Sequence, residues 1–185
     1  IAFTSLRNSN RPQIYRLNLE DNTVKALSEK FSLDAQPAWS PDGKQILYVA
    51  ERSSKKDIWV MDAEGGNKSQ FTHTPSLLDS LPSWSPNGKE VLITQYIAVG
   101  GVPRVVIAPF NLDDYVEYQI GKEKRPMRDA VMSPDGYWIA FEGWDPGGKH
   151  NIYLITTTGI SIHQLTSEQT MAFDPVWHPL PLPEG

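Results

Sequence analysis

The sequence predicts an all-β fold, and three observations support this prediction. The apolar runs are short, rich in Ile, Val, Tyr, Trp and Phe, and separated by turn residues, as is typical of strands. Fifteen Pro and 13 Gly allow many turns. A pattern also recurs along the chain, with Trp39, Trp84, Met132 and Trp177 at spacings of 45, 48 and 45 residues. Four short strands in a period of this length indicate β-propeller blades, because each small sheet must stack on its neighbours to bury its faces.

Each repeat contains four apolar tracks, and each track predicts one strand. The first strand carries the tryptophan position, where the large ring is expected to fill the space between adjacent blades. The second track begins at Ile1, Ile46, Val91 and Ile139, the third contains Ile14-Tyr15, Ile58-Trp59, Val105-Val106 and Ile152-Tyr153, and the fourth ends near Leu27-Ser28, Phe71-Thr72, Ile120 and Leu165-Thr166. Between the first two strands, Ser-Pro-Asp-Gly predicts a tight turn, in which Pro41 presets φ and Gly43 takes a positive φ.

The number of strands predicts how the ring closes. The chain begins on the second strand of a blade, runs through three complete blades and ends on a lone first strand at 175–178. Pairing of this strand beside the one that begins at Ile1 would complete four four-stranded antiparallel blades and leave no open sheet edge. The predicted units of a single domain, 1–185, are then approximately 1–28 plus 175–178, 37–72, 82–120 and 129–166. The alternatives are a fragment of a six- to eight-bladed propeller and two chains that complete one ring.

The repeat resembles a known family. The motif "WSPDGKQILYV", followed by "DIWVMDAEGGN" and "FT", resembles the TolB-type, WD40-like propeller repeat over nearly the whole chain. The third unit departs from it through "YIAVGGVPR", and the final "VWHPLP" lacks the Asp-Gly turn. The resemblance implies a bacterial, extracytoplasmic protein-binding platform or the sensor portion of a larger multidomain protein. Related propellers gate peptidases or carry lyase and hydrolase sites, so an enzyme or enzyme accessory is the alternative.

Composition and motifs argue against several other classes of function. The chain has 17 basic and 22 acidic residues, a net charge of −5, which disfavours general binding to nucleic acid. It has no cysteine, and no apolar run approaches the roughly 20 residues that span a bilayer. The histidines His73, His150, His163 and His178 lack metal-ligand spacing, and no nucleophile elbow or phosphate-binding loop is present. We therefore expect no metal, no cofactor and no catalytic residue.

The candidate binding residues lie in the long connections. These connections, from second to third and from fourth to first strands, emerge on one side of a propeller, here called the long-loop face, and the tight turns form the opposite turn face. Long, unequal loops on a rigid scaffold are where binding residues concentrate. Arg and exposed aromatic residues favour protein interfaces, so the candidate partner-binding residues are Arg128, Trp144, Phe173, Phe31 and Leu78. Four acids that precede the innermost strands, Asp34, Asp79, Asp129 and Asp174, are candidate carboxylates at the channel mouth, where they would bind a cation or the loop backbone.

Overall fold

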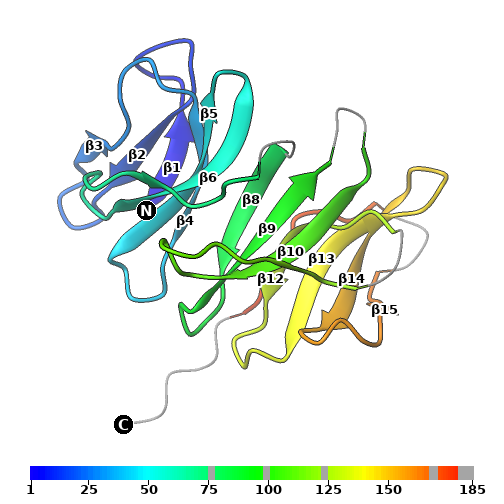
Figure 1. Cartoon of the computed structure of the whole chain (residues 1–185). Helices are drawn as coiled ribbons and strands as arrows, with labels where there is room; N and C mark the ends of the chain where they lie inside the picture. Colours follow the sequence, from blue (N-terminus) through cyan, green and yellow to red (C-terminus); the bar gives the residue numbers. More distant parts are fainter. Residues whose placement is uncertain (75–77, 98–100, 122–124, 167–170, 179–185) are drawn as a thin grey trace, which may run out of the picture.

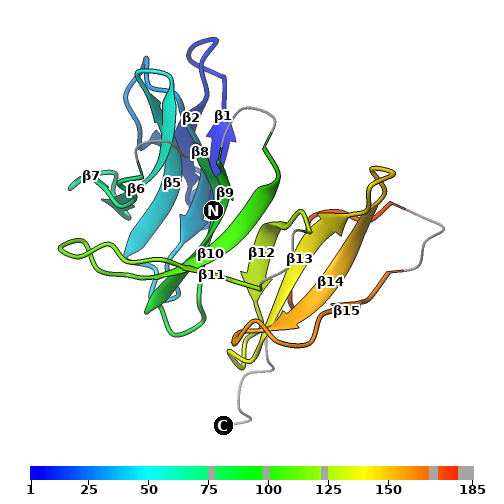
Figure 2. The same ribbon diagram turned by 45° about the vertical axis from the view of Figure 1, so that its right-hand side comes forward.

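The computed structural model describes residues 1–74, 78–97, 101–121, 125–166 and 171–178 of the chain. These residues form fifteen strands, and no helix long enough to cross a membrane occurs among them. The strands make four antiparallel sheets that stand side by side in an arc (Figures 1 and 2). The predicted all-β class, with small sheets repeated along the chain, is therefore confirmed.

Each sheet follows the order of the chain. The first sheet contains β1 (Ala2–Ser5), β2 (Gln13–Leu17) and β3 (Val24–Ala26); the second contains β4 (Asp34–Trp39), β5 (Gln45–Arg52), β6 (Lys55–Asp62) and β7 (Ser69–Gln70); the third contains β8 (Leu78–Trp84), β9 (Glu90–Tyr96), β10 (Pro103–Pro109) and β11 (Tyr118–Gln119); and the fourth contains β12 (Arg128–Met132), β13 (Trp138–Trp144), β14 (His150–Thr156) and β15 (His163–Gln164). Three sheets thus have four strands, and the first sheet has three.

The turn between the first two strands of a sheet is closed by a serine as well as by the predicted Asp and Gly. In the second sheet, Asp42 accepts the Ser40 hydroxyl at 2.7 Å and the Lys44 backbone N–H at 3.1 Å. The Ser40 hydroxyl oxygen in turn accepts the N–H of Gln45 at 2.9 Å, and Gly43 has a φ of 69°. This local network needs only consecutive residues, which explains why the turn is recognisable in the sequence.

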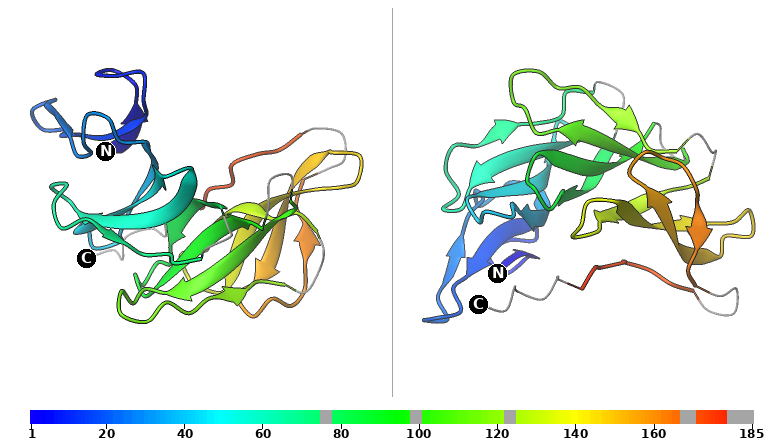
Figure 3. Two further views of the ribbon diagram at one scale, coloured as in Figure 1. Left: turned by 45° about the horizontal axis from the view of Figure 1, so that its top comes forward. Right: turned by 90° about the horizontal axis from the view of Figure 1, so that it is seen from below.

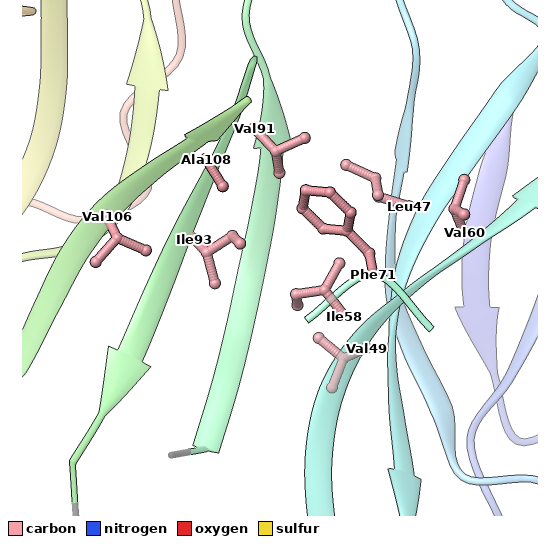
Figure 4. Packing of buried hydrophobic residues seen from close by; sticks show 9 residues of the cluster. All are labelled: Leu47, Val49, Ile58, Val60, Phe71, Val91, Ile93, Val106 and Ala108. Carbon is pink, nitrogen blue, oxygen red and sulfur yellow. The ribbon is translucent and has the colours of Figure 1, made fainter. Parts of the chain in front are cut away.

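Apolar side chains hold neighbouring sheets together. Between the second and third sheets, Leu47 and Ile58 face Val91 and Ile93, and Phe71 lies in the middle of the cluster (Figure 4). Similar buried clusters join the first sheet to the second and the third sheet to the fourth. Because side chains alternate between the two faces of a strand, each internal sheet contributes to two of these clusters.

The first strands of successive four-stranded sheets, β4, β8 and β12, adjoin one another and share a bulge. The residue at the bulge has a positive φ in each case, 55° at Gln36, 49° at Leu81 and 50° at Asp129. The bulge also makes a contact between sheets, because the Leu81 N–H donates to the side-chain oxygen of Gln36 at 2.9 Å. Nearby, the indole N–H of Trp84 donates to the carbonyl of Ala38 at 3.1 Å. The repeated tryptophan therefore ties one sheet to the preceding sheet.

The predicted closure of the ring is wrong, because the C-terminal segment does not pair with β1. Residues 171–178 contain no strand and lie against the fourth sheet (Figure 3). Ala172 donates its backbone N–H to the carbonyl of His150 at 3.1 Å, and the Trp177 indole donates to the carbonyl of Val131 at 2.9 Å. Within the described ranges, β1 is an edge strand, and the first and fourth sheets lie at the two ends of the arc.

The reason is that the segment 171–178 docks like the first strand of a sheet. Trp177 and Trp84 each donate to a carbonyl 46 residues earlier in the chain. Asp174 has a φ of 51°, the same conformation as the bulge residue Leu81. A first strand contacts the sheet that precedes it in the chain. The segment therefore lies on the fourth sheet, which Trp177 contacts, and does not reach the first sheet.

Candidate functional site

Three candidate partner-binding residues that are distant in the sequence meet around His150 on the fourth sheet. Trp144, at the end of β13, pairs across the sheet with His150, and their rings stack at 4.8 Å with an interplanar angle of 21°. Phe173 contacts the same imidazole at 5.1 Å. The Arg128 guanidinium lies 6.0 Å from the Trp144 ring centre. We call Arg128, Glu142, Trp144, His150 and Phe173 the His150 cluster.

A buried carboxylate, Glu142, anchors this cluster. Glu142 is fully buried and lies opposite Arg128 in the pairing of β12 with β13. Arg128 binds it through two hydrogen bonds, Nε to Oε1 at 3.0 Å and Nη2 to Oε2 at 3.1 Å, and His150 Nδ1 contacts Oε1. A buried charge is tolerated only when it is paired in this way. Both carboxylate oxygens are therefore engaged, and Glu142 fixes the positions of Arg128 and His150.

Sequence reasoning missed Glu142 and His150. The available signal was an acid inside the apolar strand "IAFEGW", where a lone Glu requires a buried partner. The identity of that partner depends on strand pairing, because Arg128 precedes Glu142 by 14 residues and His150 follows it by eight.

Two of the predicted channel-mouth carboxylates, Asp129 and Asp174, lie together beside the cluster. Asp129 occupies the bulge of β12, and its backbone N–H donates to the Thr94 hydroxyl oxygen at 3.1 Å. Burial, followed by the hydrogen bond and charge of Asp174, raises the pKa of Asp129 to about 6. Oxygens of Asp129, Asp174 and Glu142 lie within 4.8 Å of one another. Because Arg128 and His150 already bind the carboxylate of Glu142, we do not assign these three acids as a cation site.

Asp34 and Asp79 occupy a different position in their strands from that of Asp129. Both are buried and lie two residues before a bulge, opposite Ala50 and Gln95 of their own sheets. Asp34 forms an ion pair with Arg52 at 2.8 Å. Burial raises the pKa of Asp79 to about 6, although a hydrogen bond from the Thr72 side chain lowers it in part. Asp34 and Asp79 therefore share one position in the repeat, and Asp129 occupies another.

The remaining two candidates, Phe31 and Leu78, lie outside the fourth sheet. Phe31 is 69% exposed and borders a hollow of about 680 Å³ between the first and second sheets. Arg11, Lys30 and Arg52 line the same hollow. Leu78 is half-buried at the start of β8. The structure thus gathers three of the five candidates, Arg128, Trp144 and Phe173, into one place.

The stacked sheets, whose first strands adjoin one another, define the chain as a β-propeller, with its candidate site where the loops between strands are long. Residues 1–181 match the TolB beta propeller domain, and the chain belongs to this family.

Individual similar proteins support the assignment to this family. The chain is 39% identical over 75 residues to the Tol-Pal system protein TolB of Hahella chejuensis, a match that covers 39% of this chain and 17% of the relative. Among solved structures, TolB from Acinetobacter baumannii is similar with a TM-score of 0.73 and 22% identity, over 89% of this chain and 40% of the other. An oligogalacturonate lyase from Vibrio parahaemolyticus is similar with a TM-score of 0.65 and 16% identity, over 86% of this chain and 44% of the other.

At these identities the similarity to the solved structures concerns the fold alone. The chain spans less than half the length of each of these three proteins. Together with the edge position of β1 among the described strands, these coverages favour the alternative prediction, in which the four sheets are a fragment of a larger propeller.

Proposed function

We propose that this propeller is a non-catalytic protein-binding module and that its partner docks on the long-loop face over the His150 cluster. The observation that carries the proposal is the convergence of Trp144, Phe173 and Arg128 around one imidazole. Aromatic residues and Arg are the side chains most enriched at the centres of protein interfaces. Phe173 is 48% exposed and Met171 is 61% exposed, so an apolar rim is available to a partner.

The relatives supply the first partners to test. Because matching proteins are named as Tol-Pal system proteins, we propose that the partner is another protein of such a system, and that the chain is bacterial and acts outside the cytoplasm. As one part of a longer propeller, it would contribute a portion of the whole docking surface. An enzymatic or enzyme-accessory role remains the alternative; the lyase shares the fold only, so it adds no support for a shared reaction.

Site-specific cross-linking in the bacterium tests this proposal. A photoreactive phenylalanine analogue at position 173 is expected to cross-link to a Tol-Pal system protein. The matched control places the same analogue at Tyr137, an aromatic residue on the turn face that is 70% exposed. Cross-linking at 137 but not at 173 would show that the wrong face was chosen, and turnover of a substrate by the purified chain alone would replace the proposal with the enzymatic alternative.

Arg128 is not a suitable probe of this surface, although the sequence indicates it as one. It holds the fully buried Glu142, so its removal would unfold the site and not only weaken docking. Substitution of Phe173 and Met171 leaves that ion pair in place. The Phe31→Ala variant is a further control on the same face, because Phe31 is more exposed than Phe173 and lies outside the His150 cluster.

A further inference from the structure

Unpartnered polar atoms gather on one face of the second sheet. Among the described residues, six buried side-chain oxygen or nitrogen atoms form no hydrogen bond. Five of these atoms belong to four residues of the second sheet, Asp34, Tyr48, Asp57 and Trp59. Because buried polar groups in folded proteins nearly always have a hydrogen-bond partner, such a concentration at one place calls for a partner from outside the chain.

Strand pairing places these four residues around one small side chain. Asp34 of β4 and Asp57 of β6 both lie opposite Ala50 of β5, one on each side of it. Trp59 lies opposite Tyr48, which is the neighbour of Ala50 on the same face of β5. Tyr48 and Ala50 belong to the buried cluster between the first and second sheets, so this face looks toward the first sheet. We call these five residues the Ala50 patch.

Two ion pairs balance the charges of the patch. The Arg52 guanidinium lies 2.8 Å from Asp34, and the Lys55 ammonium lies 3.0 Å from Asp57. Neither contact has hydrogen-bond geometry, so the Oδ1 atoms of both carboxylates can still accept a hydrogen bond. A neutral ligand group preserves this balance, whereas an added charge would disturb it.

The patch offers both donors and acceptors to a ligand. The Tyr48 hydroxyl and the Trp59 indole N–H can donate, whereas the two carboxylates only accept. Burial raises the pKa of Tyr48, and the nearby charge of Asp34 raises it further, so this hydroxyl keeps its proton. A hydroxyl group on a ligand both donates and accepts at one atom, and its hydrogen can rotate toward either carboxylate. A phosphate or carboxylate offers acceptors alone and leaves the two acids of the patch without a donor.

A hollow at the long connections adjoins the patch. It has a volume of about 680 Å³, within the range of small-molecule sites. Arg52 lines the hollow and lies 5.5 Å from the ring centre of Trp59, so it borders both the hollow and the patch. Its side chain is 41% exposed and can move aside to admit a ligand group to Asp34. The other charged residues of the lining are two cations and two acids, Arg11, Lys30, Glu29 and Glu51, which add no net charge.

We propose that the hollow and the Ala50 patch together bind a neutral, hydroxyl-rich small molecule of the sugar class. Its hydroxyl groups donate to Asp34 and Asp57 and accept from Tyr48 and Trp59. Phe31, 69% exposed at the rim of the hollow, offers an aromatic ring to the apolar face of such a molecule. The site lies between the first and second sheets, whereas the His150 cluster lies on the fourth, so this proposal and the proposed function can fail separately.

Two Tyr→Phe variants separate ligand binding from stability. Tyr48→Phe removes a buried hydroxyl that has no partner, so it should leave the melting temperature unchanged or raise it. The same variant should weaken sugar binding about two- to tenfold, the range of one neutral hydrogen bond. Tyr115→Phe is the matched control on the third sheet, because the Tyr115 hydroxyl donates to Glu117 at 2.6 Å. This control should lower the melting temperature and leave sugar binding unchanged.

The indole N–H of Trp59 reports binding directly in ¹H–¹⁵N correlation spectra, where its loss in Trp59→Phe assigns the signal. The probes are the methyl glycosides of glucose, galactose and mannose, with inorganic phosphate and the peptide Gly-Asn-Gly for contrast. At least one glycoside should shift this signal with a Kd on the order of 1 mM, a value expected for a few hydrogen bonds. The Trp84 indole signal, whose N–H is bonded to Ala38, should not move.

Three results would overturn the proposal. If no glycoside shifts the Trp59 signal at concentrations up to about 50 mM, the patch binds no sugar. If phosphate or the peptide shifts the signal as strongly as the glycosides, the class of ligand is wrong. If Tyr48→Phe binds the glycoside as tightly as the original chain does, the ligand lies elsewhere and the Ala50 patch is not its site.

Discussion

Trp84 should contribute to stability through two separable contacts between the second and third sheets. Its ring packs against the buried cluster between these sheets and lies 4.6 Å from Phe110, and its indole N–H donates to the carbonyl of Ala38. Removal of a buried aromatic ring costs about 3–5 kcal/mol. Because Trp84 is only partly buried, we expect the lower end of this range, about 3 kcal/mol, for Trp84→Ala. Trp84→Phe keeps a ring and loses the hydrogen bond, so it should cost about 1 kcal/mol.

Urea denaturation followed by circular dichroism measures both variants. Tyr137→Ala provides the control, because Tyr137 is 70% exposed and its removal should change the free energy of unfolding by less than about 0.5 kcal/mol. The reasoning fails if Trp84→Ala costs no more than this control. It also fails if Trp84→Phe costs as much as Trp84→Ala, because the ring would then contribute nothing beyond its hydrogen bond.

Three further predictions concern a turn, a buried acid and the His150 cluster. Gly65→Ala should destabilise the chain by at least about 1 kcal/mol more than Gly136→Ala. A Cβ at Gly65 would lie 2.8 Å from the carbonyl oxygen of Leu27, whereas a Cβ at Gly136 would meet nothing within 4 Å. Equal melting temperatures of the two variants would contradict this prediction. The pKa of Asp79 is raised to about 6, so this residue stabilises the fold at low pH and loses that contribution as the pH rises through about 6. Asp79→Asn should therefore flatten the pH dependence of the melting temperature. An unchanged pH dependence would refute this prediction. Arg128→Met should lower the free energy of unfolding by about 3 kcal/mol, because the buried Glu142 loses its main partner. Adding Glu142→Gln should restore part of that stability in the same urea titration. If it restores none, the ion pair is not the cause of the loss.

Local features of this chain were predictable from the sequence. Ser40, Asp42 and Gly43 form their turn through hydrogen bonds among neighbouring residues, so their order in the chain is sufficient to recognise it. The repeat of about 45 residues follows from the requirement that each small sheet bury its faces against the next. These two features predicted the all-β class and the family resemblance, and both predictions are confirmed.

The site needed the tertiary structure, because its parts are brought together by strand pairing. The sequence indicates Arg128, Trp144 and Phe173 individually as interface residues. Only the register of β12, β13 and β14 and the docking of 171–178 place them around His150. Both Asp79 and Asp129 lie in a first strand, but Asp129 occupies the bulge of its strand whereas Asp79 lies two residues before the bulge of its own. A shift of two residues within a strand does not disturb the apolar pattern, so the sequence alone could not reveal it.

The position of the C-terminal segment shows the same limit. The apolar and tryptophan pattern of 175–178 determined that it resembles a first strand, and a first strand can meet either the sheet before it or an open edge elsewhere. The hydrogen bond from the Trp177 indole to the carbonyl of Val131, 46 residues earlier, places this segment on the fourth sheet. Periodicity specifies which side chains an element buries, whereas the choice of partner depends on contacts between residues far apart in the chain, and only the folded structure contains them.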